Sequence, residues 1–262
     1  MIHAIRGELT RLRNPYTLLG GVGLMAILGV VTTVIVFVSA GDGPRMGPAQ
    51  QGVTVAVLEG PDGMFAGLQN AADMIGIVAL AIWAVAVTSD YSSGLIRLLV
   101  QAEPRRLRLL GGKVAALTAL TCLATLVTTA VVLAASPAIA GMAGVSTEIW
   151  SDGLLETVAK GYLDLTLAAL LWGVAGLFLG MMTRSTGIAI AAGIGYLLVF
   201  ENLLSLVLET ATKWLPGATF SALAAGGSAD MAYTTALLLG TAYAVAAIVA
   251  AATVFRRRDI TA

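Results

Sequence analysis

Six long apolar runs constrain what this chain can fold into more than any other feature of its sequence. A helix rises about 1.5 Å per residue, so about 20 apolar residues are needed to cross a hydrocarbon core roughly 30 Å thick. The runs cover about residues 17–39, 71–88, 110–138, 158–182, 187–207 and 231–255. We therefore predict an all-α polytopic membrane protein with six transmembrane helices, formed by residues 1–262 as a single domain.

The composition agrees with a membrane protein, since 58% of the residues are hydrophobic and only 11% are charged. The runs lack the alternating pattern of barrel strands, and backbone exposed to lipid must satisfy its own hydrogen bonds, which favours helices. The first run is longer than the apolar segment of a cleaved signal peptide, about 7–15 residues, so we expect a retained anchor. The single cysteine, Cys122, excludes a disulfide framework and a cysteine metal site.

The distribution of basic residues predicts the orientation, because Lys and Arg near span ends favour the cytoplasmic side. Twelve of the fifteen lie before the first run, between the second and third, after the fourth, and at the end of the chain. The three exceptions are Arg45, Lys160 and Lys213. We therefore expect a multi-pass protein of the cytoplasmic (inner) membrane with both termini in the cytoplasm.

Residues 1–15 form an amphipathic pattern ahead of the first run. Their apolar residues Ile2, Ile5, Leu9 and Leu12 share one helical face, opposite Arg6, Glu8, Arg11 and Arg13. This pattern predicts an N-terminal helix in the membrane interface. The alternative is a basic flank that only sets orientation.

The cytoplasmic segment 90–108 lies in the stretch DYSSGLIRLLVQAEPRRLRLLGGK, residues 90–113. Ser92 and Ser93 are potential helix caps, and Pro104 suits the first turn of the next helix. Between them we predict a short helix whose apolar residues must be covered by a protein or by lipid. It is either a docking helix for a partner or an amphipathic helix held against lipid headgroups by its arginines.

This stretch resembles the loop of permease subunits of export-type (type 2) ABC transporters. In that family an acidic residue, an aromatic residue and Gly-Thr-x-Arg precede Leu-Leu, a Pro-Arg pair and a Lys that opens the third span. Leu95 stands where Thr is commoner. The ending FRRRDI, residues 255–260, and the long connection before the sixth span also resemble the family. The matching positions are Asp90, Tyr91, Gly94, Arg97, Leu98, Leu99, Pro104, Arg105, Arg106 and Lys113.

The resemblance implies that the short helix is a coupling helix, seated on a separate cytosolic ABC ATPase that binds ATP and Mg. It also implies a second permease copy, as a homodimer or a related heterodimer, and export of an amphipathic drug, peptide or lipid-like substrate. Membrane lipids are further expected partners, and nucleic acid is not. The residues expected to couple to the ATPase are Tyr91, Gly94, Leu95, Ile96, Arg97, Leu98, Leu99, Pro104, Arg105 and Arg106.

No catalytic or cofactor-binding motif is found in this chain. LLGGKV, residues 109–114, lacks the first Gly and the final Ser or Thr of a phosphate-binding loop. His3 is the only histidine, which excludes histidine-based metal sites and a Ser-His dyad inside the membrane. Asp73 and Asp164 could form an aspartyl pair, but they lack the glycine-rich surroundings of intramembrane aspartyl proteases. We therefore expect a transport subunit, not an enzyme, with no cofactor or metal of its own.

Three acidic residues within the apolar runs are candidates for a substrate path, because charge inside a membrane is costly. Glu201 is expected beyond the midplane, where it could line an outer vestibule. The alternatives are that Asp73 and Asp164 mark span ends in water and that Glu201 caps a break or bonds a neighbouring helix. The complete set of path candidates is Asp73, Tyr162, Asp164, Tyr196, Glu201 and Asn202.

Two further patterns concern packing. Gly176 and Gly180, and likewise Ala191 and Gly195, have the small-residue spacing that lets helices approach closely, within one subunit or at a dimer seam. Residues 208–230 are an outer connection of loop with some helix, for which the resemblance implies re-entrant helices. An alternative function is a gradient-driven transporter or a membrane scaffold whose basic loop binds anionic lipid.

Overall fold

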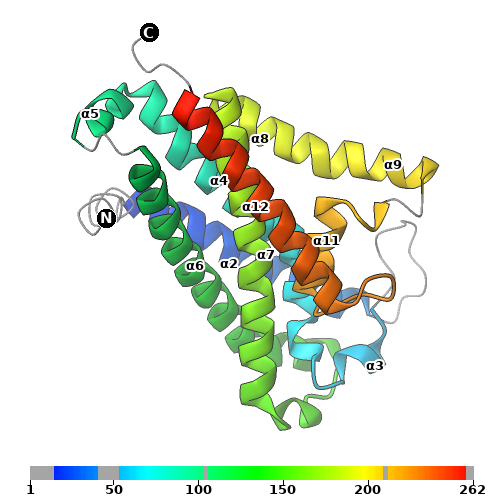
Figure 1. Ribbon diagram of the computed structural model, residues 1–262. Coiled ribbons are helices and arrows are strands. Elements are labelled where there is room, and N and C mark those ends of the chain that lie inside the picture. Colours follow the sequence, from blue (N-terminus) through cyan, green and yellow to red (C-terminus); the bar gives the residue numbers. More distant parts are fainter. Residues whose placement is uncertain (1–14, 41–52, 103–105, 209–211, 258–262) are drawn as a thin grey trace.

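The computed structural model describes residues 15–40, 53–102, 106–208 and 212–257, apart from the side chains of residues 15–19, 97, 99, 100 and 102. Within these ranges the chain is helical and contains no strand (Figure 1). Six of the described helices are long and apolar enough to cross a membrane, which confirms the predicted all-α polytopic fold. They are α2 (Pro15–Ser39), α4 (Ala66–Ser92), α6 (Arg106–Ala143), α7 (Leu154–Thr183), a fifth built from α8 (Thr186–Gly195), η3 (Tyr196–Glu201) and α9 (Asn202–Val207), and α12 (Tyr233–Arg257).

Short elements connect the long helices at the two ends of the bundle. α5 (Leu95–Ala102) joins α4 to α6 at one end, which we call the α5 end (Figure 1). The opposite end, the α3 end, carries α3 (Val55–Leu58), η1 (Gly63–Phe65) and η2 (Glu148–Ser151). α11 (Pro216–Ala224) precedes α12 and packs against α4, α7 and α12. The predicted connection 208–230 therefore contains a short helix.

The centre of the bundle is the seam between α4 and α7, where small residues allow the two backbones to approach closely. A Cβ atom on Gly176 would overlap the backbone carbonyl of Leu80, and one on Gly76 would overlap the Trp172 ring. Gly180 lies against Ala84 in the same way. The predicted close packing at Gly176 and Gly180 is confirmed, and it occurs within one chain.

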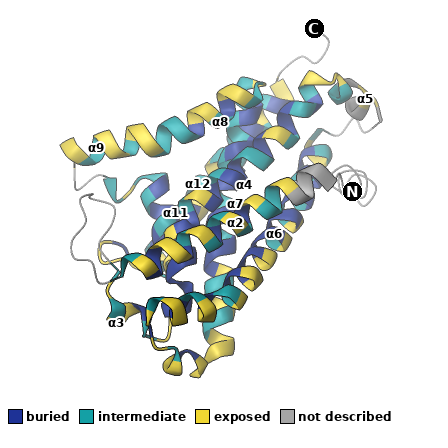
Figure 2. Ribbon diagram, turned by 180° about the vertical axis from the view of Figure 1, so that it is seen from behind, coloured by how far each residue is buried: buried dark blue, intermediate teal, exposed yellow. Residues whose placement is uncertain are grey.

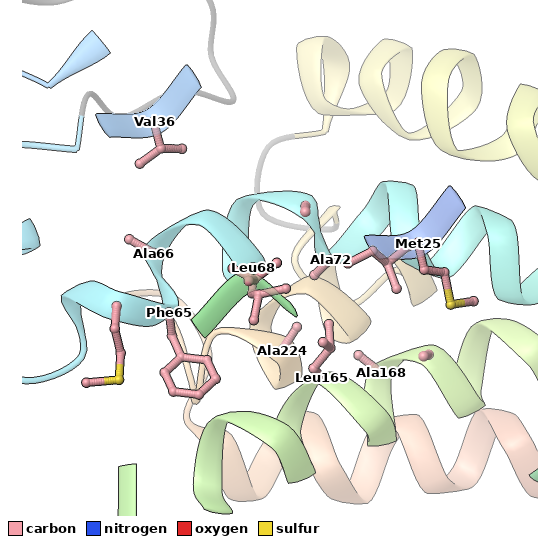
Figure 3. Close-up of a cluster of buried hydrophobic side chains, with 14 of the residues drawn as sticks. Met25, Val36, Phe65, Ala66, Leu68, Ala72, Leu165, Ala168 and Ala224 are labelled. Carbon is pink, nitrogen blue, oxygen red and sulfur yellow. The ribbon is translucent and has the colours of Figure 1, made fainter. Parts of the chain in front are cut away.

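Apolar side chains from several elements fill the core on either side of this seam. Figure 3 shows Phe65, Leu68, Leu165 and Ala224, which come from η1, α4, α7 and α11. α2 adds Met25 to the same cluster. At the α3 end, the Trp150 ring packs edge-on against Phe37, with centroids 6.0 Å apart. The core therefore joins helices that are distant in sequence.

Buried hydroxyl groups also connect the helices. The Trp83 Nε1 group donates a hydrogen bond to Thr121 Oγ1 at 2.9 Å, which joins α4 to α6. The hydroxyls of Thr125 and Thr166 lie 2.8 Å apart and join α6 to α7. Such bonds provide attraction between helices in a medium where apolar contact alone provides little.

The fifth long helix departs from this compact arrangement. We call α8, η3 and α9 together the splayed span: α8 packs against α4 and α7, whereas η3 and α9 project sideways from the bundle and are largely exposed (Figure 2). Ala191 is exposed, and a Cβ on Gly195 would meet no atom within 4 Å. The prediction that these two residues pack within one subunit is therefore wrong, and Gly193 instead lies against the Leu80 side chain.

The middle of the splayed span is π-helical, over η3. A π-helical turn disturbs the ordinary hydrogen-bond pattern and is often found at functional sites. The Asn202 side-chain amide donates to the carbonyls of Leu197 and Leu198 at 3.2 and 3.1 Å. The side chain thus satisfies backbone groups within the irregular turn.

The predicted helix over residues 1–15 lies almost entirely outside the described residues, as do Arg45, Pro104 and Arg105. One local prediction at the α5 end needs correction. Ser92 and Ser93 donate hydrogen bonds to the Ser89 carbonyl, at 3.2 and 2.6 Å. They therefore complete the end of α4 and do not cap α5.

Candidate functional site

The α5 end contains the first candidate site, a short helix that is only partly attached to the bundle. α4 ends at Ser92, and Gly94 turns the chain into α5 with φ +69°, a conformation that favours glycine. Ile96 packs against the apolar cluster that contains Val87 and Phe255. Leu98, in contrast, is 62% exposed. α5 is therefore anchored on one side and presents an apolar residue on the other.

A buried ion pair lies directly beneath α5. Lys113 Nζ is 2.8 Å from Asp90 Oδ2, and the two side chains are 10% and 2% exposed. Lys113 also donates to the Ala86 carbonyl at 3.0 Å. Because an unpaired charge at this depth would be costly, the pair joins the end of α4 to the start of α6. Both residues were predicted only as parts of the motif. A sequence signal for this ion pair existed, because Asp90 and Lys113 carry opposite charges at the adjoining ends of consecutive spans.

Other contacts attach the same region to α7 and α12. The Arg184 guanidinium lies 5.3 Å from the centre of the Tyr91 ring. Arg106 donates to the carbonyls of Phe255 and Arg256, at 3.0 and 3.3 Å. Tyr91 and Ile96 line a small pocket of about 30 Å³ together with the ion pair. The structure thus brings together these coupling candidates. Arg97 and Leu99 lie in α5 without described side chains.

A polar cavity of about 870 Å³ forms the second candidate site, between the splayed span, α4 and α11. Asp73 accepts a hydrogen bond from the Ser221 hydroxyl at 2.7 Å. Glu201 accepts one from the Gly217 backbone N–H, also at 2.7 Å. Its lining carries both charges and apolar groups, and includes Asn70, Asp73, Met74, Ile77, Leu197, Leu198, Glu201, Asn202, Lys213, Gly217, Ser221 and Asp230.

Glu201 connects the splayed span to α11. Besides its bond to Gly217, its carboxylate is close enough to Asp73 for an electrostatic interaction. A Cβ atom on Gly217 would overlap that carboxylate, so the close approach requires glycine there. Glu201 therefore both bonds a neighbouring helix, as the alternative interpretation has it, and lines a cavity. That this cavity is an outer vestibule stays a prediction.

An apolar pocket of about 570 Å³ lies beside the polar cavity, among α7, α8, α11 and α12. Trp172 and Phe220 form part of its wall, with ring centroids 5.2 Å apart. The α12 side of the pocket consists of alanines and Tyr243. Tyr196, at the start of η3, also lines this pocket. Sequence patterns gave no signal for this pocket, because it depends on how far the splayed span departs from α12.

The remaining path candidates occupy other positions. Tyr162 donates to the Cys122 carbonyl at 3.2 Å and so joins α7 to α6. Asp164 is only 4% exposed and interacts with Tyr233 and Lys160, so it does not simply mark a span end in water. Neither Tyr162 nor Asp164 lines the polar cavity or the apolar pocket. The cavity thus collects Asp73, Glu201 and Asn202 from the predicted set.

Among the residues that the structure describes, no group of three or more His, Cys, Asp or Glu side chains could hold a metal ion. Comparison with protein families gives one match, over residues 48–261, to a family described as protein of unknown function (DUF2705). No curated protein matches this chain.

Proposed function

The chain belongs to the DUF2705 family, and we propose that it is the permease subunit of an ATP-driven exporter, of the kind that its loop sequence resembles. In this proposal a cytosolic ABC ATPase docks on α5, and a second permease copy completes the pathway. The cargo is an amphipathic drug, peptide or lipid-like molecule that leaves through the outer side of the membrane. ATP and Mg bind to the ATPase and not to this chain.

The observation that carries the proposal is the attachment of α5. An eight-residue helix with an exposed leucine is a suitable docking element, because an exposed apolar residue outside the membrane gains from being covered. α5 itself packs on α4 and α6, and Ile96 contacts the apolar cluster that contains Phe255 of α12. Directly beneath α5, the Asp90–Lys113 pair and the contacts of Tyr91 and Arg106 link α4, α6, α7 and α12 to one another. A push on α5 would therefore reach four of the long helices.

The charge distribution supports a cytoplasmic position for the α5 end. Lys113 and Arg184 lie at this end with Arg106, Arg256 and Arg257, close to the α5 contacts described above. The α3 end instead carries Glu59, Asp62, Glu148 and Asp152 in its short elements and turns. This is the asymmetry that the positive-inside rule associates with a cytoplasmic α5 end.

The proposal is tested by co-purification from the native membrane in mild detergent. Wild-type chain is expected to recover an ABC ATPase identifiable by mass spectrometry, and Leu98→Glu to reduce that recovery about tenfold or more, as at an interface hot spot. Leu155→Glu is the matched control, because Leu155 is 84% exposed at the α3 end. Recovery of no ATPase with intact wild-type protein, or equal loss in both variants, would overturn the proposal.

A second candidate function is a gradient-driven transporter, favoured by the two carboxylates of Asp73 and Glu201 on one cavity. In that case no ATPase would co-purify, the basic residues near α5 would bind anionic lipid, and transport would require an ion gradient. Loss of gradient-dependent transport in Glu201→Gln would support this candidate over the ABC-type exporter.

A further inference from the structure

The polar cavity and the apolar pocket share one wall, built from two segments of the chain. In η3, Tyr196 lines the apolar pocket, whereas Leu197, Leu198 and Glu201 line the polar cavity. In α11, Pro216 and Phe220 line the apolar pocket, whereas Gly217 and Ser221 line the polar cavity. The bond from Gly217 N–H to Glu201 fastens the two segments together. The segments η3 and α11 thus separate the polar cavity on one face from the apolar pocket on the other.

The apolar pocket has the shape and chemistry for a hydrocarbon chain. Its volume of about 570 Å³ falls within the range typical of small-molecule sites, roughly 300–1,000 Å³. α8 and α12 both form part of its lining but make few contacts with each other, so side chains from these helices do not close it. The α12 side presents Ala244, Ala246, Ala247 and Ala250, whose short side chains leave room for a ligand.

The polar edge of this pocket carries a buried hydroxyl beside a carboxylate. Tyr196 Oη is buried and interacts with the Glu201 carboxylate, although the two groups make no hydrogen bond of ordinary geometry. Tyr243 Oη, in contrast, donates to the Trp214 carbonyl. Both hydroxyls lie within electrostatic range of the Glu201 carboxylate. The Tyr196 oxygen has lone pairs that can accept a hydrogen bond, so an N–H donor on a ligand would satisfy this buried group more fully.

We propose that this wall binds a cationic amphiphile with a single hydrocarbon chain. The chain occupies the apolar pocket against Trp172 and the α12 alanines. The cationic head, for example a primary ammonium, lies at the Tyr196 end of the pocket and donates a hydrogen bond to Tyr196 Oη, the group that connects the pocket to the Glu201 carboxylate. The Asp73 carboxylate, on the same cavity as Glu201, adds to the negative field at the head. Lys213 also lines the polar cavity, but the carboxylates of Asp73, Glu201 and Asp230 outnumber it, so an anionic head is disfavoured.

As the cargo class of the exporter, this assignment rests on the proposed function, but binding can be measured on the isolated chain. The probe is dodecylammonium with a photoreactive diazirine at the chain terminus, added to full-length protein in detergent. After illumination, mass spectrometry of peptides locates the label. We expect label on the pocket side of α12 and on α8, displaced by excess unlabelled dodecylammonium and about tenfold less effectively by dodecyl sulfate.

Two α12 variants separate the pocket from general lipid exposure. Ala247→Trp is expected to fill the pocket and to abolish displaceable labelling. Val245→Trp introduces the same side chain at a neighbouring α12 position that does not line the pocket and is 55% exposed, so labelling should persist. Both variants are first checked for monodisperse elution. Equal, non-displaceable labelling of all exposed apolar faces in wild type and in Ala247→Trp would overturn the proposal.

Glu201→Gln tests recognition of the head. The Gln side-chain oxygen can still accept the Gly217 N–H bond, so the wall is retained while its charge is lost. We expect about tenfold weaker binding of dodecylammonium, with unchanged binding of uncharged dodecyl maltoside. Equal weakening of both ligands would show that Glu201 only shapes the wall. Site-specific labelling without ATPase co-purification would support the amphiphile site and reject the exporter. ATPase co-purification without site-specific labelling would support the exporter and reject the amphiphile site.

Discussion

The helices α4 and α7 and the splayed span are all apolar enough to cross a membrane, yet they differ greatly in how much of their surface is packed against the rest of the protein. In α4 and in α7, 61% of the most apolar stretch is buried inside the protein, against 6% in the splayed span. The difference lies in shape. At the seam, tryptophan rings or backbone occupy the space that a Cβ atom would need on Gly76, Gly173 and Gly176. In the splayed span, a Cβ atom on Gly187 or Gly195 would meet no atom within 4 Å. Apolar character brings a helix into the membrane, and close approach decides its neighbours.

The largest effect is expected where the packed part of the bundle buries charge. Lys113→Met leaves the Asp90 carboxylate buried without its cation and should lower the free energy of unfolding by about 3–5 kcal/mol. Unfolding in detergent by a denaturant titration, followed by tryptophan fluorescence, measures this loss. The double variant Asp90→Asn, Lys113→Met should recover much of it. Equal losses in the single and double variants would show that the pair does not hold α4 and α6 together.

A smaller effect is expected from a matched pair of glycine substitutions. Gly176→Leu overpacks the seam against the Leu80 backbone and should cost about 1–3 kcal/mol of unfolding free energy. Gly195→Leu places the same side chain in open space, so its effect should stay within about 0.5 kcal/mol. The same denaturant titration compares them. If Gly195→Leu is as costly as Gly176→Leu in the isolated subunit, the splayed span packs more closely than described.

The smallest effect is expected within the splayed span itself. Asn202→Leu removes the hydrogen bonds to the Leu197 and Leu198 carbonyls and should cost about 1 kcal/mol locally. Hydrogen exchange of a peptide covering η3 should become faster, with little change in global unfolding. Asn70→Leu is the control, because the Asn70 amide makes a similar bond to the Ala66 carbonyl in α4. This variant should leave the hydrogen exchange of the η3 peptide unchanged. Unchanged exchange in Asn202→Leu would mean that the irregular turn does not depend on this side chain.

The spans could be predicted from sequence because crossing a bilayer imposes a length and a composition that can be counted. Their ends were less predictable. The third span was expected at 110–138 and extends over Arg106–Ala143, since a helix continues through polar flanks and past Pro137. Close packing within one subunit was correctly predicted at Gly176 and Gly180, but the sequence did not indicate that α4 is the partner. The same spacing at Ala191 and Gly195 gave a wrong prediction, because spacing does not show which face meets a neighbour.

The candidate sites show the same limit. The search for acidic residues in apolar runs drew attention to Asp73 and Glu201, and the structure places both on one cavity. Asp164 has the same carboxyl group but interacts with Tyr233 and Lys160, and the candidate Tyr162 donates to the Cys122 carbonyl. The Glu201–Gly217 bond depends on a π-helical turn and a short helix folding back, and no periodic pattern encodes either. Residue type therefore indicated the chemistry, and tertiary structure decided the location.

The length of α6 has a mechanical consequence. Its 38 residues form a rod about 57 Å long, nearly twice the thickness of a hydrocarbon core of roughly 30 Å. A rigid rotation of about 5° around its midpoint would move each tip by about 2.5 Å. That amplitude is comparable to a hydrogen-bond length, although contacts near the pivot would hardly change. Since α6 begins beside α5 and continues to the α3 end, it can act as a lever that delivers a small angular movement as a displacement on the far side.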